Sequence, residues 1–203
     1  MDSLVKPVIH VNAYGVNCAL GNSPKEVAGR LFAGDTQGIQ LQIGWVQDKP
    51  LLVGAANVPL PALRAEWHLH ASRNNRVLLH AMEQIEKPVR TAIEKLGNHR
   101  VGVVLGTSTT GIGESQKLLQ SPSPGAATSA GYRYAMQEQG SPAEFLRAYW
   151  DLGGPAWVVS TACSSSARAF IAAKRLLEQN ICDAVITGGV DTLCKLTLNG
   201  FSA

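Results

Sequence analysis

The sequence lacks long apolar runs and clusters of a single charge. No window approaches the roughly 20 apolar residues of a membrane-spanning helix, so no membrane span is predicted. Lys and Arg are spread along the chain, and the net charge is only +3. This distribution disfavours a nucleic-acid binder and a protein that docks on a membrane surface. The opening letters, MDSLVKPVIH, show no export signal.

Cysteine is scarce, and its four occurrences form neither a C-x-x-C pair nor the spacing of a zinc site. They are Cys18, Cys163, Cys182 and Cys194. A chain of this size can bury its own core and needs no disulfides, so we expect free thiols in a reducing cytoplasm. His68 and His70 form an H-x-H pair without a third ligand, so we predict no metal and no other cofactor.

What the sequence does contain suits a compact α/β protein. Of its 203 residues, 45% are hydrophobic and 16% are charged, which supports a real core and argues against disorder. Runs rich in β-branched residues predict four strands: PVIHVNAYG, RVGVVLG, AWVVST and CDAVITGGV. The last two flank a predicted helix over residues 164–180. A strand–helix–strand unit of this kind predicts a right-handed crossover between parallel strands.

Helix signals separate these strands. Ser23, Pro24 and Glu26 form a capping box with proline at the first helical position, and Gly34 is expected to end that helix. Its predicted buried stripe consists of Val27, Ala28, Leu31 and Phe32.

Two further helices are expected before the cysteine-containing segment. The longest periodic stretch, residues 72–97, predicts a helix that Pro88 kinks or splits and Gly97 ends. A later helix is predicted with Ser141 as its cap. The remaining segments are interpreted as a loop with a small hairpin over 37–61, a glycine-broken loop over 107–116 and a turn-rich stretch over 121–128.

One cysteine stands where an apolar strand becomes a helix, in the stretch PAWVVSTACSSSARAFIAAKRLL. We predict Cys163 in the first turn of that helix, where free amides and the helix dipole favour the thiolate form. Small neighbours would let a substrate approach, and the amide of Cys163 could donate to a carbonyl oxygen under attack. The helix behind it is expected to pack through Ala169, Phe170, Ala173, Leu176 and Leu177. From position alone, a plain packing role for Cys163 is an equal alternative.

The stretch GPAWVVSTACSSSARAF, followed by CDAVITGGVDTL and NGFSA, resembles the active-site region of the β-ketoacyl-[acyl-carrier-protein] synthases. These are the elongating condensing enzymes of the thiolase superfamily. Upstream, PVIHVNAYGVNCALG, MEQ and RVGVVLGTSTTGIGE match the N-terminal half of that family in order and spacing. The resemblance covers residues 1–203 but only about half of a family member. It implies the N-terminal half of a thiolase-like layered α/β fold, a mostly parallel sheet with covering helices.

The resemblance also implies a chemistry. Cys163 would accept an acyl chain as a thioester, and malonyl-carrier protein would lose carbon dioxide and attack it, giving a product two carbons longer. Thr109 and Ile112 would lie by the acyl pocket and the dimer interface. Arg73 and Arg76 would offer basic groups to the acidic acyl carrier protein, although solvated helix charges explain them equally well. The family pairs as a dimer, so a homodimer or heterodimer is expected.

The sequence departs from the family in one respect. The two histidines and the lysine that such synthases use for decarboxylation lie in their C-terminal half, and this chain has no histidine after Cys163. Together with the ending NGFSA, this favours an N-terminal piece of a full synthase; a truncated gene product and a site completed by another chain are the alternatives. We expect such a fragment to be inactive in condensation by itself.

Three alternatives stay beside this reading. A thiolase acting on acyl-coenzyme A shares the cysteine at a helix start, but TACSSS and NGFSA favour the carrier-protein enzymes. A non-catalytic partner subunit that sets chain length usually lacks the nucleophile, which Cys163 retains. A dinucleotide-binding loop at GTSTTGIGE does not fit the glycine spacing of the phosphate-binding fingerprint.

Overall fold

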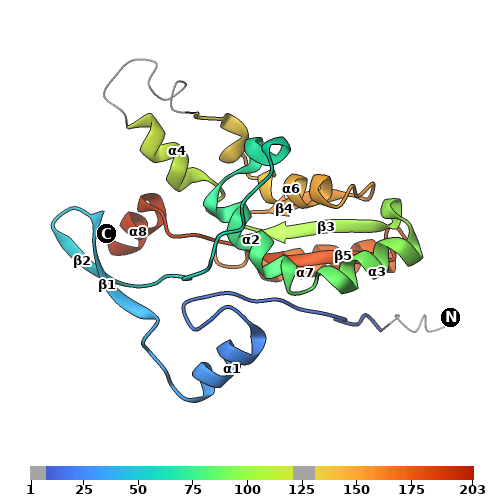
Figure 1. Ribbon diagram of the computed structural model, residues 1–203, viewed down its shortest axis with the longest axis horizontal. Helices are drawn as coiled ribbons and strands as arrows, with labels where there is room; N and C mark the ends of the chain where they lie inside the picture. The colour runs from blue at the N-terminus through green and yellow to red at the C-terminus, as the bar shows by residue number, and fades with distance from the viewer. Residues whose placement is uncertain (1–7, 121–130) are drawn as a thin grey trace, which may run out of the picture.

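A computed structural model describes residues 8–120 and 131–203, and its centre is a three-stranded parallel sheet (Figure 1). The strands are β3 (Val101–Gly106), β4 (Ala156–Val159) and β5 (Ala184–Gly189), in the order β4-β3-β5. Both neighbours of β3 run parallel to it, with Gly106 level with Val159 on one side and Gly189 on the other. The predicted α/β class with a parallel sheet is therefore confirmed, and all three strands end at one edge.

Helices cover both faces of this sheet, because β3 is apolar on each. Its residues Val101, Val103 and Leu105 pack into one core with α2, α3 and α6, whereas Val104 packs into a second core with α7. Every residue of β3 is buried. A strand covered on both faces has no polar side, which is why RVGVVLG is a continuous apolar run. The result is a helix–sheet–helix layering.

The helices of the larger core are α2 (Arg73–Glu83), α3 (Glu86–Leu96) and α6 (Ser141–Tyr149). The long periodic stretch is split as predicted, with Pro88 in the first turn of α3, where its missing amide costs no hydrogen bond. Phe145 of α6 is fully buried, and its ring centroid lies 6.3 Å from that of Trp67. Trp67 belongs to the 3-10 helix η1 (Ala65–His70).

The start of α6 differs from the prediction. Ser141 is the first helical residue and not the cap, a position that Gly140 takes without a side-chain bond. The reason is that the Ser141 hydroxyl accepts a hydrogen bond from the Asn75 side chain at 3.1 Å and so ties α6 to α2. The other short 3-10 helices are η2 (Asn98–Arg100) and η3 (Tyr134–Met136).

The other face of the sheet is covered by α7 (Ser165–Glu178), which connects β4 to β5. Ala169, Ala173 and Leu176 are buried as predicted, but Phe170 is 48% exposed, so its predicted packing is wrong. Phe170 stands one position round the helix from Ala169 and therefore points away from the sheet. A last helix, α8 (Lys195–Ser202), follows β5.

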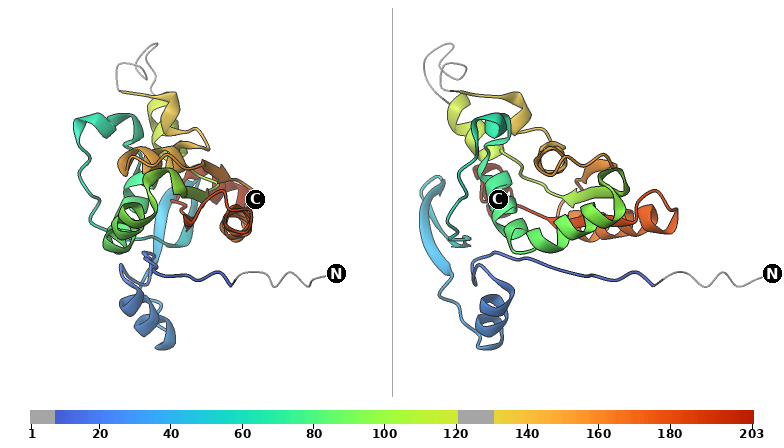
Figure 2. Two further views of the ribbon diagram at one scale, coloured as in Figure 1. Left: turned by 90° about the vertical axis from the view of Figure 1, so that its right-hand side faces the viewer. Right: turned by 45° about the vertical axis from the view of Figure 1, so that its right-hand side comes forward.

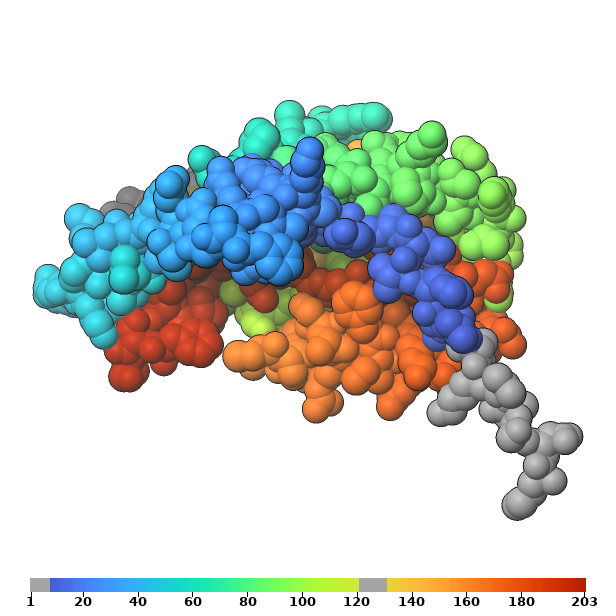
Figure 3. All heavy atoms as spheres, turned by 90° about the horizontal axis from the view of Figure 1, so that it is seen from below, coloured from blue at the N-terminus to red at the C-terminus, as the bar shows by residue number. Residues whose placement is uncertain are grey.

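An antiparallel hairpin lies apart from the sheet (Figure 2). Its strands are β1 (Ile39–Val46) and β2 (Lys49–Gly54), which confirms the small hairpin expected in this region. In Figures 1 and 3 the hairpin lies beside α8. The Asn199 side chain donates to the backbone oxygen of Trp45 at 3.0 Å, which fastens α8 to β1.

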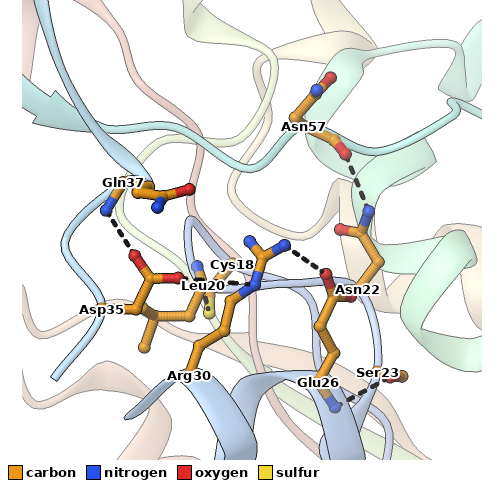
Figure 4. Close-up of polar contacts among 9 residues, drawn as sticks. All are labelled: Cys18, Leu20, Asn22, Ser23, Glu26, Arg30, Asp35, Gln37 and Asn57. Carbon is orange, nitrogen blue, oxygen red and sulfur yellow. Dashed lines mark hydrogen bonds and ion pairs between the residues drawn. The ribbon is translucent and has the colours of Figure 1, made fainter. Parts of the chain in front are cut away.

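The first helix, α1 (Pro24–Phe32), begins with the predicted cap, since the Ser23 hydroxyl accepts a hydrogen bond from the amide of Glu26 (Figure 4). Its predicted apolar stripe is wrong, because no residue of α1 is buried and Phe32 is 89% exposed. Figure 2 shows α1 standing away from the layered body, so the stripe has no core to face. Polar contacts instead surround the helix, including the Arg30 ion pairs with Glu26 and Asp35 in Figure 4.

The predicted first strand is not formed in its described part, residues 8–15. The extended chain runs beneath α2 and α3 and joins no sheet (Figure 2). The chain just after this segment is held by Gln84, whose side chain accepts from the amide of Val16 and donates to the carbonyls of Val16 and Asn22.

The loop predicted over 107–116 is also wrong in its second half. Helix α4 (Ile112–Leu119) begins inside it, with Gly111 as the cap. Glycine is well accepted at a helix cap, so the glycine that indicated a break marks a beginning. The turn-rich stretch predicted over 121–128 lies outside the described residues. In the described part of the chain, no helix has the length and apolarity needed to cross a membrane.

Candidate functional site

Cys163 lies in a short turn between the end of β4 at Val159 and the start of α7 at Ser165. The helix begins at Ser165, one residue later than predicted, with Ser164 as its cap, so Cys163 precedes the first turn. Its side chain is exposed, unlike those of Cys182 and Cys194, which are buried. The thiol therefore stands at the sheet edge where the parallel strands end, accessible to a reagent or substrate.

The turn that carries Cys163 has a constrained backbone. Ala162 adopts φ of +51°, a left-handed conformation that residues other than glycine rarely take. Ser165 is 2% exposed, and its hydroxyl donates to the carbonyl of Ala162 at 2.6 Å. The same hydroxyl accepts from the amide of Thr161 at 2.9 Å. One buried serine thus ties the two residues before Cys163 to the start of α7 and compensates for the strain at Ala162.

The start of α7 sits directly on the sheet. A β-carbon added to Gly106 would collide with the backbone of Ser165 and Ser166, and one added to Gly189 would collide with the Ser166 hydroxyl. Only glycine permits this approach. The glycines at the ends of β3 and β5 therefore bring the helix start, and with it the Cys163 turn, down onto the strand ends.

The backbone around Cys163 leaves donors free. Within the described part of the chain, the amide of Cys163 donates no hydrogen bond, whereas those of Ser164 and Ser165 donate to the carbonyls of Thr161 and Ala162. A free amide next to an exposed thiol at a helix start is arranged to receive a carbonyl oxygen while sulfur attacks the carbon.

A second loop at the same edge is held by Asp191, which follows β5. One of its carboxylate oxygens, Oδ1, accepts hydrogen bonds from the Thr107 hydroxyl at 3.2 Å, the Ser108 amide at 2.7 Å and the Thr109 hydroxyl at 3.1 Å. Ser108 in turn donates through its hydroxyl to the carbonyl of Ala162 at 3.4 Å. The loop after β3 is therefore linked both to the end of β5 and to the Cys163 turn.

The two residues expected by the acyl pocket lie in different settings. Thr109 is 4% exposed, and besides donating to Asp191 its hydroxyl accepts from the amide of Thr192 at 3.0 Å, so its polar group is fully engaged. Ile112, at the start of α4, lines a groove of about 720 Å³ between the hairpin, α4 and α8. Apart from Ile112, the groove wall consists of apolar and amide side chains and one lysine: Trp45, Gln47, Gln116, Leu119, Gln120, Gln137, Lys195, Leu196 and Asn199. Cys163 is not part of this wall.

The two arginines expected to meet a carrier protein contact the chain itself. The guanidinium of Arg76 donates to the carbonyls of Pro61 and Leu60 at 2.9 and 3.0 Å. That of Arg73 is exposed and donates to the carbonyl of Ala56 at 3.1 Å. Both therefore hold the segment that leads from β2 to η1, and Arg73 is the more exposed of the two.

Three of the histidines make contacts with residues outside the Cys163 turn. The ring of His70 lies 5.7 Å from that of Phe145, and burial lowers its pKa although Glu144 opposes this. His80 hydrogen-bonds to Asn17 at 3.2 Å. His99 lies against Gly153, just before the start of β3 and therefore at the end of the sheet opposite Cys163. Over residues 8–120 and 131–203, no three His, Cys, Asp or Glu residues are grouped to hold a metal ion.

Two residues of the site were not predicted as such. Ser165 and Asp191 were visible in the sequence only as letters of SSS and GGVD. Each acts through a contact that the fold creates, and the only signal for Asp191 is a carboxylate directly after a buried strand, at the edge where the cysteine turn also lies.

Comparisons with known proteins show the family and the fold of the chain. The profile of a family described as "Beta-ketoacyl synthase, N-terminal domain" matches residues 66–203. Among solved structures, the chain is similar to a ketosynthase (ApeO) in complex with its chain length factor (ApeC) from Xenorhabdus doucetiae. That match has 39% identity and a TM-score of 0.87, and it covers 95% of this chain and 49% of that one.

Two more distant structures share the fold. A beta-ketoacyl synthase from Burkholderia phymatum STM815 has 22% identity and a TM-score of 0.76, covering 93% of this chain and 47% of the other. A type II PKS acyl-carrier protein in complex with its ketosynthase bound to the hexaketide (AntDE:AntF) matches at 13% identity and a TM-score of 0.71, covering 94% and 52%. The chain spans about half the length of these structures. No match was found among curated protein sequences.

Proposed function

The chain belongs to the beta-ketoacyl synthase family, and from this premise we propose that Cys163 carries the acyl group in a decarboxylative condensation with malonyl-carrier protein. The observation that supports this most directly is the exposed thiol in a strained, closed turn at the start of α7, beside its own free amide. The same ordering of strand, cysteine turn and helix is what the resemblance of TACSSS implies.

The loading step uses groups of this chain. The Cys163 thiolate attacks the carbonyl carbon of an acyl thioester on the carrier protein, forming a new carbon–sulfur bond. The amide of Cys163 donates to the oxygen as negative charge develops there. The bond to the phosphopantetheine sulfur then breaks, and that sulfur takes up the proton that Cys163 gave up. The product is an acyl-cysteine and a free carrier thiol.

The condensation step requires groups beyond those near Cys163 here. Malonyl-carrier protein loses carbon dioxide, the resulting carbanion attacks the acyl-cysteine carbonyl, and the Cys163 thiolate leaves. The contacts of His70, His80 and His99 are with Phe145, Asn17 and Gly153 and not with the Cys163 turn. We assign to this chain the loading chemistry and attribute decarboxylation to residues outside it.

Partner choice follows from the same family. An acyl carrier protein is the donor, and Arg73 is the better candidate of the two arginines for docking it, because its charge is exposed while Arg76 is engaged. Thr109 supports the loop beside the cysteine turn. We assign Ile112 to acyl binding because it lines a groove of mixed apolar and polar side chains, although Cys163 lies outside the wall of that groove. A homodimer or a heterodimer with a chain-length partner is the expected assembly, the latter because the ketosynthase from Xenorhabdus doucetiae is in complex with such a factor.

Peptide mass spectrometry after incubation with acyl donors tests the loading step. The natural full-length protein is mixed separately with octanoyl-carrier protein and with octanoyl-coenzyme A, and the acylated cysteine is located. Acylation of Cys163 from the carrier protein, abolished by Cys163→Ala, is the expected result. Acylation from coenzyme A alone would indicate a thiolase, and no adduct from either donor would indicate a non-catalytic partner subunit.

A further inference from the structure

The loop that follows β3 and the turn that carries Cys163 are joined through one carboxylate. Asp191 Oδ1 accepts three hydrogen bonds from consecutive residues, Thr107 to Thr109, at 2.7 to 3.2 Å. Asp191 itself is exposed, and it lies two residues after the last residue of β5. A single oxygen with three donors fixes the course of a loop far better than one bond does, because each donor restrains a different residue.

The loop that Asp191 holds is not a flexible connection. Thr107 is fully buried, and its hydroxyl also accepts from the amides of Thr109 and Thr110 at 3.3 Å each. Thr110 adopts φ of +44°, a conformation that persists only where its surroundings impose it. Asp191 and Thr107 together therefore impose a tight turn immediately after the strand.

Ser108 connects this turn to the segment that carries Cys163. Its amide is the closest donor to Asp191, and its hydroxyl donates to the carbonyl of Ala162, the residue before Cys163. The same carbonyl accepts the 2.6 Å bond from Ser165. The Ala162 carbonyl thus accepts hydrogen bonds from Ser165 of α7 and from Ser108 of the loop after β3. The bond from Ser108 depends on Asp191, which holds that loop.

We infer that Asp191 is a positioning residue for the nucleophile, which acts through Ser108 on the Ala162–Cys163 peptide and orients the Cys163 amide and thiol for attack on a thioester. This rests on the proposed function of Cys163 as the acylated group. Asp191 does not touch the substrate. Its effect is to keep the peptide before Cys163 in the strained conformation that aims the amide and the sulfur at one carbonyl group.

The test compares variants of the two aspartates that flank β5 in the natural full-length protein. Asp191→Ala removes the acceptor, Asp191→Asn keeps an oxygen at Oδ1, and Asp183→Ala removes an aspartate that pairs with Arg100 at the opposite end of the strand. The measurement is the single-turnover rate of Cys163 acylation from octanoyl-carrier protein over a range of donor concentrations.

For Asp191→Ala we expect the saturating rate to fall at least about 10-fold, with the half-saturating concentration of the donor unchanged. Asp191→Asn is expected to remain within about 3-fold of the wild-type rate, since a neutral oxygen still accepts from the loop. Asp183→Ala should lower the midpoint of thermal unfolding without changing the rate. A wild-type saturating rate in Asp191→Ala overturns the inference, and so does an equal fall in Asp183→Ala.

Two outcomes are separated by further measurements. If the wild-type protein is not acylated by the carrier protein, the proposed function fails. The positioning role is then tested by the rate at which iodoacetamide alkylates Cys163 in the wild type, Asp191→Ala, Asp191→Asn and Asp183→Ala. If Asp191→Ala does not fold, Ser108→Ala decides, because it removes only the side-chain bond to Ala162. A rate unchanged in Ser108→Ala overturns the inference, and a fall of several-fold supports it.

Discussion

The end of β3 touches the first turn of α7 at Gly106 and Ser166, so closely that a β-carbon on Gly106 would collide with the Ser166 amide nitrogen. This contact sets the height at which α7 starts above the strand ends. It therefore sets the position of the turn between Val159 and Ser165, which carries Cys163. The hydrophobic pattern determines the order of the elements, but the location of the site depends on the absence of a side chain at Gly106 and at Gly189.

Replacing Gly106 with alanine should destabilise the fold by about 2 kcal/mol, because an extra methyl group in a filled space forces the backbone apart. The loss should appear in urea unfolding, together with slower acylation of Cys163. Gly29→Ala is the matched control, since nothing lies near its added methyl group in α1. There the helix should gain about 0.5–1 kcal/mol, because alanine loses less freedom on folding. Equal stabilities for the two variants would contradict the proposed contact.

Labelling should distinguish the cysteines. Cys163 is exposed, whereas Cys182 is 1% exposed and burial raises the pKa of its thiol. Cys194 is also buried, and its sulfur hydrogen-bonds to the Thr197 hydroxyl. Brief treatment of the folded protein with iodoacetamide at pH 7.5 should therefore modify Cys163 well before Cys182 and Cys194, as read by peptide mass spectrometry. Unfolding in urea serves as the control and should remove the difference.

Much of the architecture follows from local patterns in the sequence. The apolar run of β3, the Ser23 cap of α1 and the division of the long helix near Pro88 each depend on neighbouring residues only. Such features are predictable because their cause lies within one turn of helix or one strand. The burial of Leu31 and Phe32 was predicted on the same local grounds and is wrong, because burial depends on a neighbouring element that α1 does not have here.

The candidate site was predictable only in part, for the same reason. TACSSS locates the nucleophile in the sequence, but the turn geometry depends on Ala162 being left-handed and on Ser165 closing the loop. Asp191 is 28 positions after Cys163 and reaches the turn only through Ser108, which lies on another strand end. A residue that acts through two hydrogen bonds across three segments leaves no periodic or spacing signal.

The ion pair between Arg100 and Asp183 predicts a pH dependence of stability. Hydrogen bonds from the Arg100 guanidinium, at 2.8 and 2.9 Å, hold the pKa of the Asp183 carboxyl below its ordinary value of 3.8. The folded state therefore favours the carboxylate, so this stabilisation is present above the unfolded pKa and is lost as the pH falls through the folded pKa. The difference in unfolding free energy between the wild type and Asp183→Asn should be largest near pH 7 and shrink below pH 3.8. A difference that stays constant down to pH 3 would contradict the assignment.

Aromatic packing around Phe145 should dominate the stability of the larger core. Phe145 is fully buried, with Trp67, His70 and Tyr149 rings at centroid distances of 5.7 to 6.3 Å. Phe145→Ala should lower the free energy of unfolding by about 3–5 kcal/mol, because it leaves a cavity that the surrounding rings cannot fill. Phe32→Ala deletes the same side chain at an 89% exposed position and should change stability by less than about 0.5 kcal/mol. Chemical denaturation of both variants provides the comparison.

Replacing the strained Ala162 should affect the stability of the fold and the acylation rate of Cys163 in different ways. Its φ of +51° costs an alanine about 1 kcal/mol that glycine does not incur, so Ala162→Gly should leave the unfolding free energy unchanged or raise it by up to that amount. The same substitution frees the peptide before Cys163 to leave the conformation that Ser165 and Ser108 impose. We therefore expect the saturating rate of Cys163 acylation to fall several-fold while thermal unfolding does not occur earlier. If stability and acylation both declined together, the turn would be serving the fold and not the orientation of the nucleophile.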